Sequence, residues 1–118
     1  MGSERLPEYF YAVYRDEVCA ALTIRSFARQ EIHAFFTGGV IPRRAGWARL
    51  SRVAARKLSM VDYAYELDDL VAPPGNRLEA LKGELLGLFS IRINDQWRVV
   101  FRWTDRGAED VDIVDYHG

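Results

Sequence analysis

At 118 residues the chain is long enough for one domain with a single core and too short for two ordinary domains. Its apolar and charged fractions, 49% and 28%, are typical of a soluble globular protein, and no apolar run approaches the roughly 18 residues of a membrane span. Cys19 is the only cysteine, which excludes an intrachain disulfide and a cysteine-based metal site. The first residues carry charges where a signal peptide would be apolar, so we expect a cytoplasmic protein with no membrane partner.

The formal net charge of −1 conceals a segregated charge distribution. Residues 23–107 contain 14 basic and 9 acidic side chains, and the acidic excess lies in the first 22 and the last 11 residues. Arginine outnumbers lysine 14 to 2, and the planar guanidinium is suited to bidentate phosphate contacts and to stacking on bases. The middle of the chain therefore favours an anionic partner.

The N-terminal part of the chain divides into an appendage and the start of a domain. We interpret residues 1–22 as an atypical N-terminal extension of amphipathic character, attached to a domain that spans residues 23–118. The domain is expected to begin with a short strand over residues 23–27. A helix over residues 28–36 follows, and the pair Gly38-Gly39 is the usual punctuation at a helix C-terminus.

A second helix is predicted over residues 44–58, and its two faces differ sharply. At roughly 100° per residue the apolar side chains fall on one side, and Arg49, Arg52 and Arg56 cluster on the other. Lys57 extends the basic character, and no acidic residue occurs within this helix. A charged outer face normally interleaves both signs, so we interpret the stripe as a surface for an anionic partner, with ordinary solvation as the alternative.

The remainder of the chain predicts a sheet. A short helical turn over residues 62–67 and a loop over residues 68–76 come first. Four strands then follow, joined by connections of hairpin length, over residues 77–82, 87–93, 97–103 and 110–116. The predicted fold is α+β, with the order β-α-α-β-β-β-β, a mainly antiparallel sheet and both helices packed on one face.

The centre of this sheet is the hairpin over residues 87–103, in which apolar and polar residues alternate on both strands. Directly opposite residues point to the same face, so keeping both apolar sets together requires an odd-numbered turn, the three residues 94–96. This register places Arg92 opposite Arg98 on an open face of the sheet. Facing like charges are destabilising unless an anion lies between them, which suggests an anion-facing surface; two solvated arginines are the alternative.

Acid/base chemistry has only two histidines available. His33 lies within the first helix among phenylalanines, where a structural role is favoured. His117 follows Asp115 and Tyr116 at the end of the strand beside the arginine-bearing hairpin, and we interpret it as functional. An arginine-lined sheet edge with tyrosine, histidine and lysine suits metal-free cleavage of RNA, in which the 2′-hydroxyl is deprotonated, phosphate charge is stabilised and the leaving oxygen is protonated. We expect no cofactor and no metal site.

Three runs of residues, RLEALKG at 77–83, SIRINDQWR at 90–98 and DYH at 115–117, together resemble the HigB branch of the RelE/ParE toxin superfamily. Residues 24–27 are similar to the usual beginning of these toxins, so the resemblance covers residues 23–118. It implies a RelE-like fold and a toxin of a type II toxin-antitoxin pair that enters the ribosomal A site and cuts mRNA there. The implied partners are the ribosome and mRNA, a HigA-like helix-turn-helix antitoxin, and operator DNA only through the antitoxin complex.

The resemblance also assigns roles to residues. By position it implies catalytic roles for Lys82, Arg98, Asp115, Tyr116 and His117. The basic side chains that we expect to contact RNA or the ribosome are Arg49, Arg52, Arg56, Lys57, Arg77 and Arg92.

Some features of the chain leave the mechanism and the activity open. Some relatives carry a histidine at the position of Glu79, so a two-histidine mechanism is not implied for this chain. If the last strand continued to residue 117, Tyr116 and His117 would face opposite sides, so either the strand ends near Asp115 or one of the two lies away from the site. Two alternative functions stay open, a ParE-like gyrase inhibitor of the same fold and a non-catalytic module that binds nucleic acid or the antitoxin.

Overall fold

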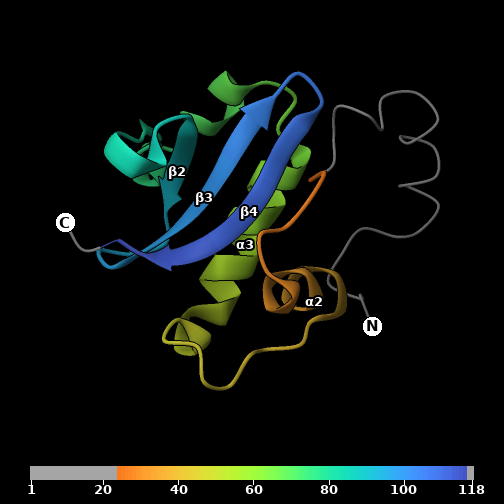
Figure 1. Ribbon diagram of the computed structural model, residues 1–118. Helices are drawn as coiled ribbons and strands as arrows, with labels where there is room; N and C mark the ends of the chain where they lie inside the picture. Colours follow the sequence, from red (N-terminus) through yellow and green to blue (C-terminus); the bar gives the residue numbers. More distant parts are fainter. Residues whose placement is uncertain (1–23, 117–118) are drawn as a thin grey trace.

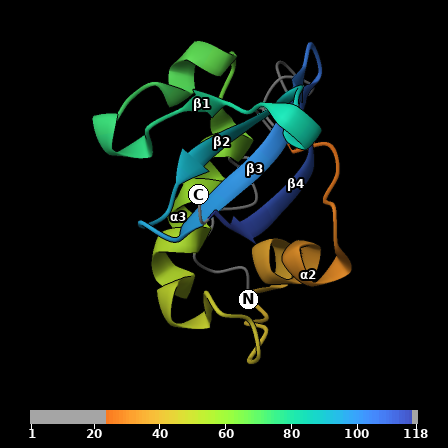
Figure 2. The same cartoon turned by 60° about the vertical axis from the view of Figure 1, so that its left-hand side comes forward.

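The computed structural model describes residues 24–116, which form a four-stranded antiparallel sheet with two α-helices on one face (Figure 1). The elements are α2 (Gln30–Gly38), α3 (Ser51–Tyr63), β1 (Glu79–Ala80), β2 (Leu88–Arg92), β3 (Trp97–Thr104) and β4 (Gly107–Asp115). Figure 2 shows the strands side by side in the order β1-β2-β3-β4, with β1 and β4 at the two edges. The predicted fold class is confirmed, and the predicted extension over residues 1–22 lies outside the described residues.

The hydrophobic core fills the space between the two helices and one face of the sheet. Ile91, Val99 and Phe101, which alternate along β2 and β3, are completely buried. Ile32 of α2 and Leu58 of α3 are buried against the same cluster. The alternation of apolar and polar residues in the sequence therefore identifies the core face of the sheet correctly.

The central hairpin has the predicted register. Arg92 lies opposite Arg98, and residues 94–96 form the turn. The side-chain oxygen of Asn94 accepts hydrogen bonds of 2.9 and 2.7 Å from the backbone N–H groups two and three residues further on, and these bonds fix the turn.

The segment before α2 does not form the strand predicted over residues 23–27. Within the described residues it makes one parallel bridge, from Phe27 to Val111, with flanking backbone hydrogen bonds to β4. Asp110 adopts a left-handed backbone conformation (φ 53°) beside this bridge, so this edge of β4 does not sustain a regular ladder. The segment nevertheless covers the edge of β4, and the Ser26 hydroxyl accepts a 2.8 Å hydrogen bond from the Asp110 N–H group.

Helix α2 both begins and ends two residues later than the predicted bounds of 28–36. Arg29, the residue before the helix, is still extended (φ −138°), because its guanidinium binds Asp112 and the carbonyl of Ile113 on β4. At the other end Gly39 has a left-handed backbone (φ 75°) and its N–H group donates to a helix carbonyl, which is the expected glycine stop.

Helix α3 is displaced further along the chain from its predicted bounds of 44–58. It begins at Ser51, after turns and a short 3₁₀ helix, Ala48–Leu50. Within these turns the ring of Trp97 lies 2.5 Å from the position that a Cβ atom of Gly46 would occupy, a close approach that only glycine allows. The helix then continues to Tyr63, since Val61 is buried in the core.

The loop between α3 and β1 is ordered by polar side chains. A 3₁₀ helix, Leu67–Leu70, replaces the predicted turn over residues 62–67 and begins with reciprocal hydrogen bonds between Glu66 and Asp69. The strand predicted over residues 77–82 is reduced to β1, because Arg77 adopts a positive φ before it and Gly83 does so after it. No helix within residues 24–116 is long and apolar enough to cross a membrane.

Candidate functional site

The face of the sheet opposite the helices brings together residues from distant parts of the chain. Glu79 of β1 lies opposite Ser90 of β2, and Arg98 of β3 lies opposite Val114 of β4. Directly opposite residues share a face, and the register of β2 with β3 places Ser90 and Arg98 on the same side. The backbone N–H group of Tyr116 donates to the carbonyl of the hairpin turn, so the end of the described chain reaches the same place.

A cleft of about 730 Å³ opens on this face. It is lined by β1, by the connection to β2 and by the end of β4: Glu79, Ala80, Leu81, Lys82, Leu85, Asp115 and Tyr116. Three predicted catalytic residues, Lys82, Asp115 and Tyr116, therefore lie around one cavity although the sequence separates Lys82 from the other two. Convergent polar groups in a concave surface are typical of a binding or catalytic site.

Arg98 is buried beneath this cleft, contrary to the prediction that it lies on an open face. Only 6% of the residue is exposed. Its Nε–H donates to the Ser90 hydroxyl at 2.7 Å, and one terminal nitrogen donates to the carbonyl oxygen of Arg77. The alternation of residues predicts which face Arg98 points to, but not that the loop ending at Arg77 and the ring of Tyr116 cover that face.

Tyr116 covers the guanidinium and joins it to a carboxylate. The guanidinium carbon of Arg98 lies 5.1 Å from the centre of the Tyr116 ring, within range for a cation–π interaction. The Tyr116 hydroxyl donates to Glu79 at 3.3 Å. Burial lowers the pKa of Arg98, while the negative charge of Glu79 acts in the opposite direction. An arginine stays protonated under these conditions, so the site holds a desolvated cation beside a carboxylate.

The end of β4 resolves the geometric question raised by the Tyr116-His117 pair. β4 ends at Asp115, so Tyr116 is free of the strand alternation and its ring turns over Arg98. Asp115 accepts a 2.9 Å hydrogen bond from the Gln96 side chain, which ties the end of β4 to the hairpin turn. His117 lies outside the described residues, so its place remains a prediction from the sequence.

Lys82 and Glu79 both line the cleft but have different surroundings. Lys82 is exposed at the rim, where it precedes a 3₁₀ helix, Gly83–Leu85. Glu79 is absent from the predicted site, yet it is the carboxylate that contacts Tyr116. Its position inside the run RLEALKG, between two basic residues, is the sequence signal that could have identified it.

The predicted basic stripe lies partly on α3 and partly on the 3₁₀ helix before it, which carries Arg49. Arg49, Arg52 and Arg56 are exposed. Lys57 is a correction, because it is only 8% exposed and its ammonium donates to the side-chain oxygen of Asn76. Burial is the main cause that lowers the pKa of Lys57, and the charges of neighbouring arginines lower it further.

Lys57 is buried because of where it lies on the helix. It lies on the buried side of the helix: Ala54 is three positions before it and Val61 four positions after it, so both share its face. The next residue, Leu58, is also buried. Its long aliphatic stem therefore runs along the core, and the ammonium points into the loop that precedes β1. The exposed part of the basic stripe therefore consists of the three arginines.

The other two predicted RNA-binding arginines lie near the cleft. Arg77 is exposed and has a left-handed backbone (φ 46°). Arg92 is half-buried and forms an ion pair with Asp95 across the hairpin turn. The hydrogen bond and charge of Arg92 lower the pKa of the exposed Asp95 carboxyl. Asp95 therefore supplies part of the negative charge that the facing pair of arginines requires.

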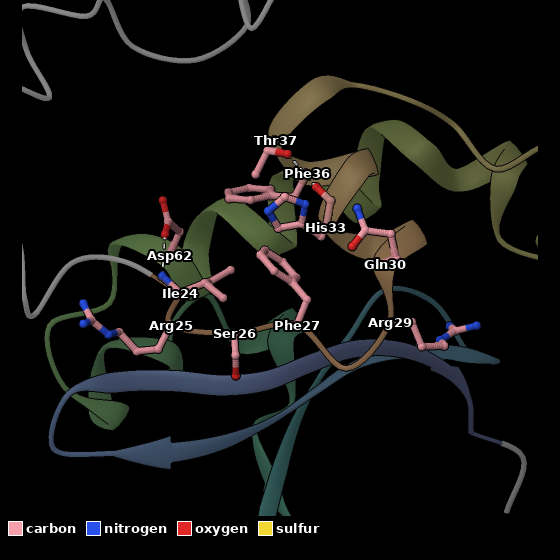
Figure 3. Close-up of a pocket in the computed structure, with 10 residues that line it drawn as sticks. All are labelled: Ile24, Arg25, Ser26, Phe27, Arg29, Gln30, His33, Phe36, Thr37 and Asp62. Atoms are coloured by element: carbon pink, nitrogen blue, oxygen red, sulfur yellow. Dashed lines mark hydrogen bonds between the residues drawn. The ribbon is translucent and has the colours of Figure 1, made fainter.

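A second, smaller hollow of about 330 Å³ lies on the helix side of the molecule, between α2 and the segment that precedes it (Figure 3). The His33 ring packs edge-on against Phe27, with ring centroids 5.2 Å apart. This contact agrees with the structural role predicted for His33. Within residues 24–116, no group of three or more His, Cys, Asp or Glu side chains is arranged to hold a metal ion.

Comparisons with known proteins agree with this fold and with the sequence motifs. The profile of a family described as RelE-like toxin of type II toxin-antitoxin system HigB matches residues 25–117. The chain is 52% identical over 50 residues to Toxin HigB-1 of Vibrio cholerae serotype O1, which is 42% of this chain and 53% of that protein. It is 38% identical over 64 residues to an uncharacterized protein of Haemophilus influenzae, which is 54% of this chain and 63% of that protein.

The chain thus spans between about half and two thirds of the lengths of these two curated relatives. Among solved structures, the YoeB dimer from Staphylococcus aureus is similar in fold, with a TM-score of 0.51 and 21% sequence identity. That likeness covers 84% of this chain and all of the YoeB chain. Because the family profile covers most of the sequence, the chain belongs to the HigB-like family of RelE-like toxins of type II toxin-antitoxin systems.

Proposed function

We propose that this chain is a metal-independent endoribonuclease that enters the ribosomal A site and cuts mRNA there, which inhibits translation. The observation that carries the proposal is the cluster in which Arg98, Tyr116 and Glu79 contact one another beside a cleft rimmed by Lys82. A buried cation can stabilise a phosphate, an aromatic ring can stack on a nucleobase, and a carboxylate can accept a proton.

The reaction that we propose is attack of a ribose 2′-hydroxyl on the adjacent phosphorus. Glu79 accepts the proton of that hydroxyl, because it is a carboxylate already positioned as a hydrogen-bond acceptor at the cleft. Arg98 and Lys82 stabilise the additional negative charge on the phosphate oxygens. His117 protonates the departing 5′ oxygen, since an imidazole titrates near neutral pH. Asp115 supports the C-terminal residues through its contact with Gln96.

The basic surfaces bind RNA in this proposal and perform no chemistry. Arg49, Arg52 and Arg56 form an exposed cationic face, on α3 and the 3₁₀ helix before it, that contacts phosphates of ribosomal RNA. Arg77 and Arg92, which lie next to Arg98, extend the positive field toward the cleft. Lys57 is not part of this surface, because its ammonium is buried against Asn76.

The proposed protein partners follow from family membership. A toxin of a type II system is paired with an antitoxin. We propose that this antitoxin is a HigA-like helix-turn-helix protein and that it is the part of the complex that binds operator DNA. Toxin HigB-1 carries the same family name in its own title. Direct binding of operator DNA by this chain alone is not proposed.

Mapping mRNA 5′ ends after induced expression tests the activity. The expected result is new 5′ ends at defined positions within codons of translated messages, and their loss with Arg98→Ala. Unchanged 5′ ends together with growth arrest would contradict the proposal and favour a gyrase inhibitor or a module that only binds.

A further inference from the structure

Three contacts hold the Arg98 side chain, in addition to the backbone hydrogen bonds of its strand. Its Nε–H group and one terminal N–H group donate to Ser90 and to the Arg77 carbonyl, and the Tyr116 ring lies over its guanidinium. A guanidinium has five N–H donors, and within residues 24–116 two of them donate to protein, which leaves three for an anion. The side chain is consequently fixed in orientation while most of its donors remain available.

The first support, Ser90, has no other evident reason to be polar. It is completely buried on β2, and its hydroxyl accepts a 2.7 Å hydrogen bond from Arg98. Burying a hydroxyl group costs free energy unless the group is hydrogen-bonded. The hydrogen bond from Arg98 offsets that cost for Ser90. Alanine would fill the same place in a strand without any polar group.

The second support is the carbonyl of Arg77, which depends on a clamp in the preceding loop. Asn76 is completely buried, and its amide nitrogen donates to the carbonyls of Leu70 and Ala72 at 3.2 and 3.3 Å. Its side-chain oxygen accepts from the ammonium of Lys57 on α3. Each polar atom of the Asn76 side chain therefore has a partner, and the loop is fastened to the helix.

The clamp controls the direction of the next carbonyl in the chain. Arg77 adopts a left-handed backbone (φ 46°, ψ 56°), a conformation that a side chain larger than glycine holds only when its surroundings enforce it. The neighbouring Asn76 is the most firmly held residue of this turn. The left-handed turn is what aims the Arg77 carbonyl at Arg98.

We infer that Ser90 and the Lys57-Asn76 clamp are positioning elements, which hold the Arg98 guanidinium in the one orientation that presents its free N–H groups to a phosphate in the cleft. The inference rests on the proposed function for the identity of the anion. The orientation itself is a property of the free protein. Lys57 thereby acquires a role in the interior, in place of the surface contact that its basic neighbours suggest.

Side-chain NMR of the full-length, ¹⁵N-labelled protein tests this directly. The measurement is the rate at which the Arg98 Nε–H proton exchanges with water, together with its nuclear Overhauser contacts to the Tyr116 ring. In the natural sequence we expect slow exchange and clear contacts. Ser90→Ala and Asn76→Ala should each raise the exchange rate at least tenfold and weaken the contacts.

Two further variants separate positioning from general destabilisation. Lys57→Met retains the buried aliphatic stem and removes only the ammonium, so it should raise the Arg98 exchange rate in a folded protein even if Asn76→Ala does not fold. Thr104→Val is the matched control, because it removes two hydrogen bonds at the far end of the same strand, and it should leave Arg98 exchange unchanged. Unchanged Arg98 exchange in both Ser90→Ala and Lys57→Met would overturn the inference.

A cleavage assay distinguishes failure of this inference from failure of the proposed function. If Ser90 acts by positioning Arg98, Ser90→Ala should slow cleavage in the natural background and have no additional effect in the Arg98→Ala background. An additional effect of equal size in both backgrounds would contradict positioning through Arg98. Changed exchange rates with full cleavage by Arg98→Ala would instead support the positioning of Arg98 and reject the catalytic role proposed for it.

Discussion

Arginine occurs in two opposite environments in this molecule: under the ring of Tyr116 on β3, and on the outer face of α3 and the 3₁₀ helix before it. Arg98 is buried, with two fixed hydrogen bonds and an aromatic ring over it. Arg49, Arg52 and Arg56 are exposed, and among the described residues none of them forms an ion pair. A fixed, desolvated guanidinium can recognise one anion in one orientation, whereas an exposed stripe supplies a field that salt screens.

This difference teaches that charge alone does not assign a role. The sequence shows both sets as basic residues in a basic region, and burial is what separates the site proposed for chemistry from the surface proposed for docking. Lys57 reinforces the point, because it is adjacent to the stripe in sequence but belongs to the interior. The predictions below test whether the two regions have the different roles that their environments indicate.

Arg98→Ala should give the largest effect. The saturating rate of mRNA cleavage should fall by about 10²–10³-fold, as when one donor to a developing oxyanion is removed. The free energy of unfolding should fall by about 1–3 kcal/mol, because Ser90 and the Arg77 carbonyl lose their partner in a buried place. Both are measured in one preparation, by cleavage on programmed ribosomes and by urea unfolding.

Arg102→Ala is the matched control on the same strand. Arg102 is half-exposed, and its ion pair with Asp110 at 3.5 Å contributes little. Stability should stay within about 0.5 kcal/mol and cleavage should persist. Equal losses for the Arg98 and Arg102 variants would mean that burial does not distinguish them.

Removing His117 and Gly118 should lower single-turnover cleavage by at least about 10²-fold, the lower end of the contribution of a positioned acid or base. β4 ends at Asp115, so the sheet keeps all of its paired strands and antitoxin binding should persist. Cleavage at the full rate would show that the imidazole is dispensable, which would leave Glu79 and the cationic groups to carry the reaction.

Two substitutions of Tyr116 separate the role of its ring from the role of its hydroxyl group. Tyr116→Phe retains the ring over Arg98 and removes the hydrogen bond to Glu79, whereas Tyr116→Ala removes both. If stacking on a base dominates, Tyr116→Ala should weaken cleavage roughly tenfold or more, in line with stacking worth about 1–3 kcal/mol, and Tyr116→Phe should cost less. Equal effects of the two substitutions would assign the role to the hydroxyl.

Replacing Arg49, Arg52 and Arg56 together should act on binding rather than on chemistry. Ribosome affinity should fall, and the slope of log affinity against log salt should become shallower by roughly two to three, as expected for three lost phosphate contacts. The measurement is sedimentation or fluorescence binding at several salt concentrations. An unchanged slope would mean that the stripe is ordinary solvation or serves the antitoxin.

The smallest effect is expected from Asp95→Asn in the hairpin turn. The Arg92 ion pair lowers the pKa of Asp95 below its ordinary value of 3.8, so the carboxylate contributes stability above that value and loses it as the pH falls through the lowered pKa. The natural protein should therefore exceed the variant in stability only slightly near pH 7, and the difference should vanish in acid. Chemical unfolding at a series of pH values, from pH 7 down to well below the ordinary pKa of 3.8, compares the two.

Much of the fold could be predicted because it depends on periodicity. The hairpin register followed from the alternation of Val99 and Phe101 and from one turn length, and the structure has that register. The strand predicted before α2 failed for a local reason, the left-handed backbone of Asp110, which no pattern in the neighbouring residues signals. The turns that precede α3 include a close contact between Gly46 and Trp97, which are far apart in sequence, so no local pattern reveals it.

Only part of the candidate site could be predicted from the sequence. Motifs located Lys82, Asp115 and Tyr116, and these line one cleft. The environment of Arg98 could not be predicted, because it depends on a carbonyl in the loop before β1 and on the path of the chain after β4. Strand periodicity assigns a residue to a face of the sheet, while loops decide whether that face is open.

Single-turnover cleavage on programmed ribosomes, measured over a range of toxin concentrations, tests the division of roles most directly. The two variants to compare are Arg98→Ala and the triple substitution of Arg49, Arg52 and Arg56. The account predicts that Arg98→Ala lowers the saturating rate at an unchanged half-saturating concentration, and that the triple variant raises that concentration at an unchanged saturating rate. If both variants change the same parameter, the separation of a catalytic buried arginine from a docking surface is contradicted.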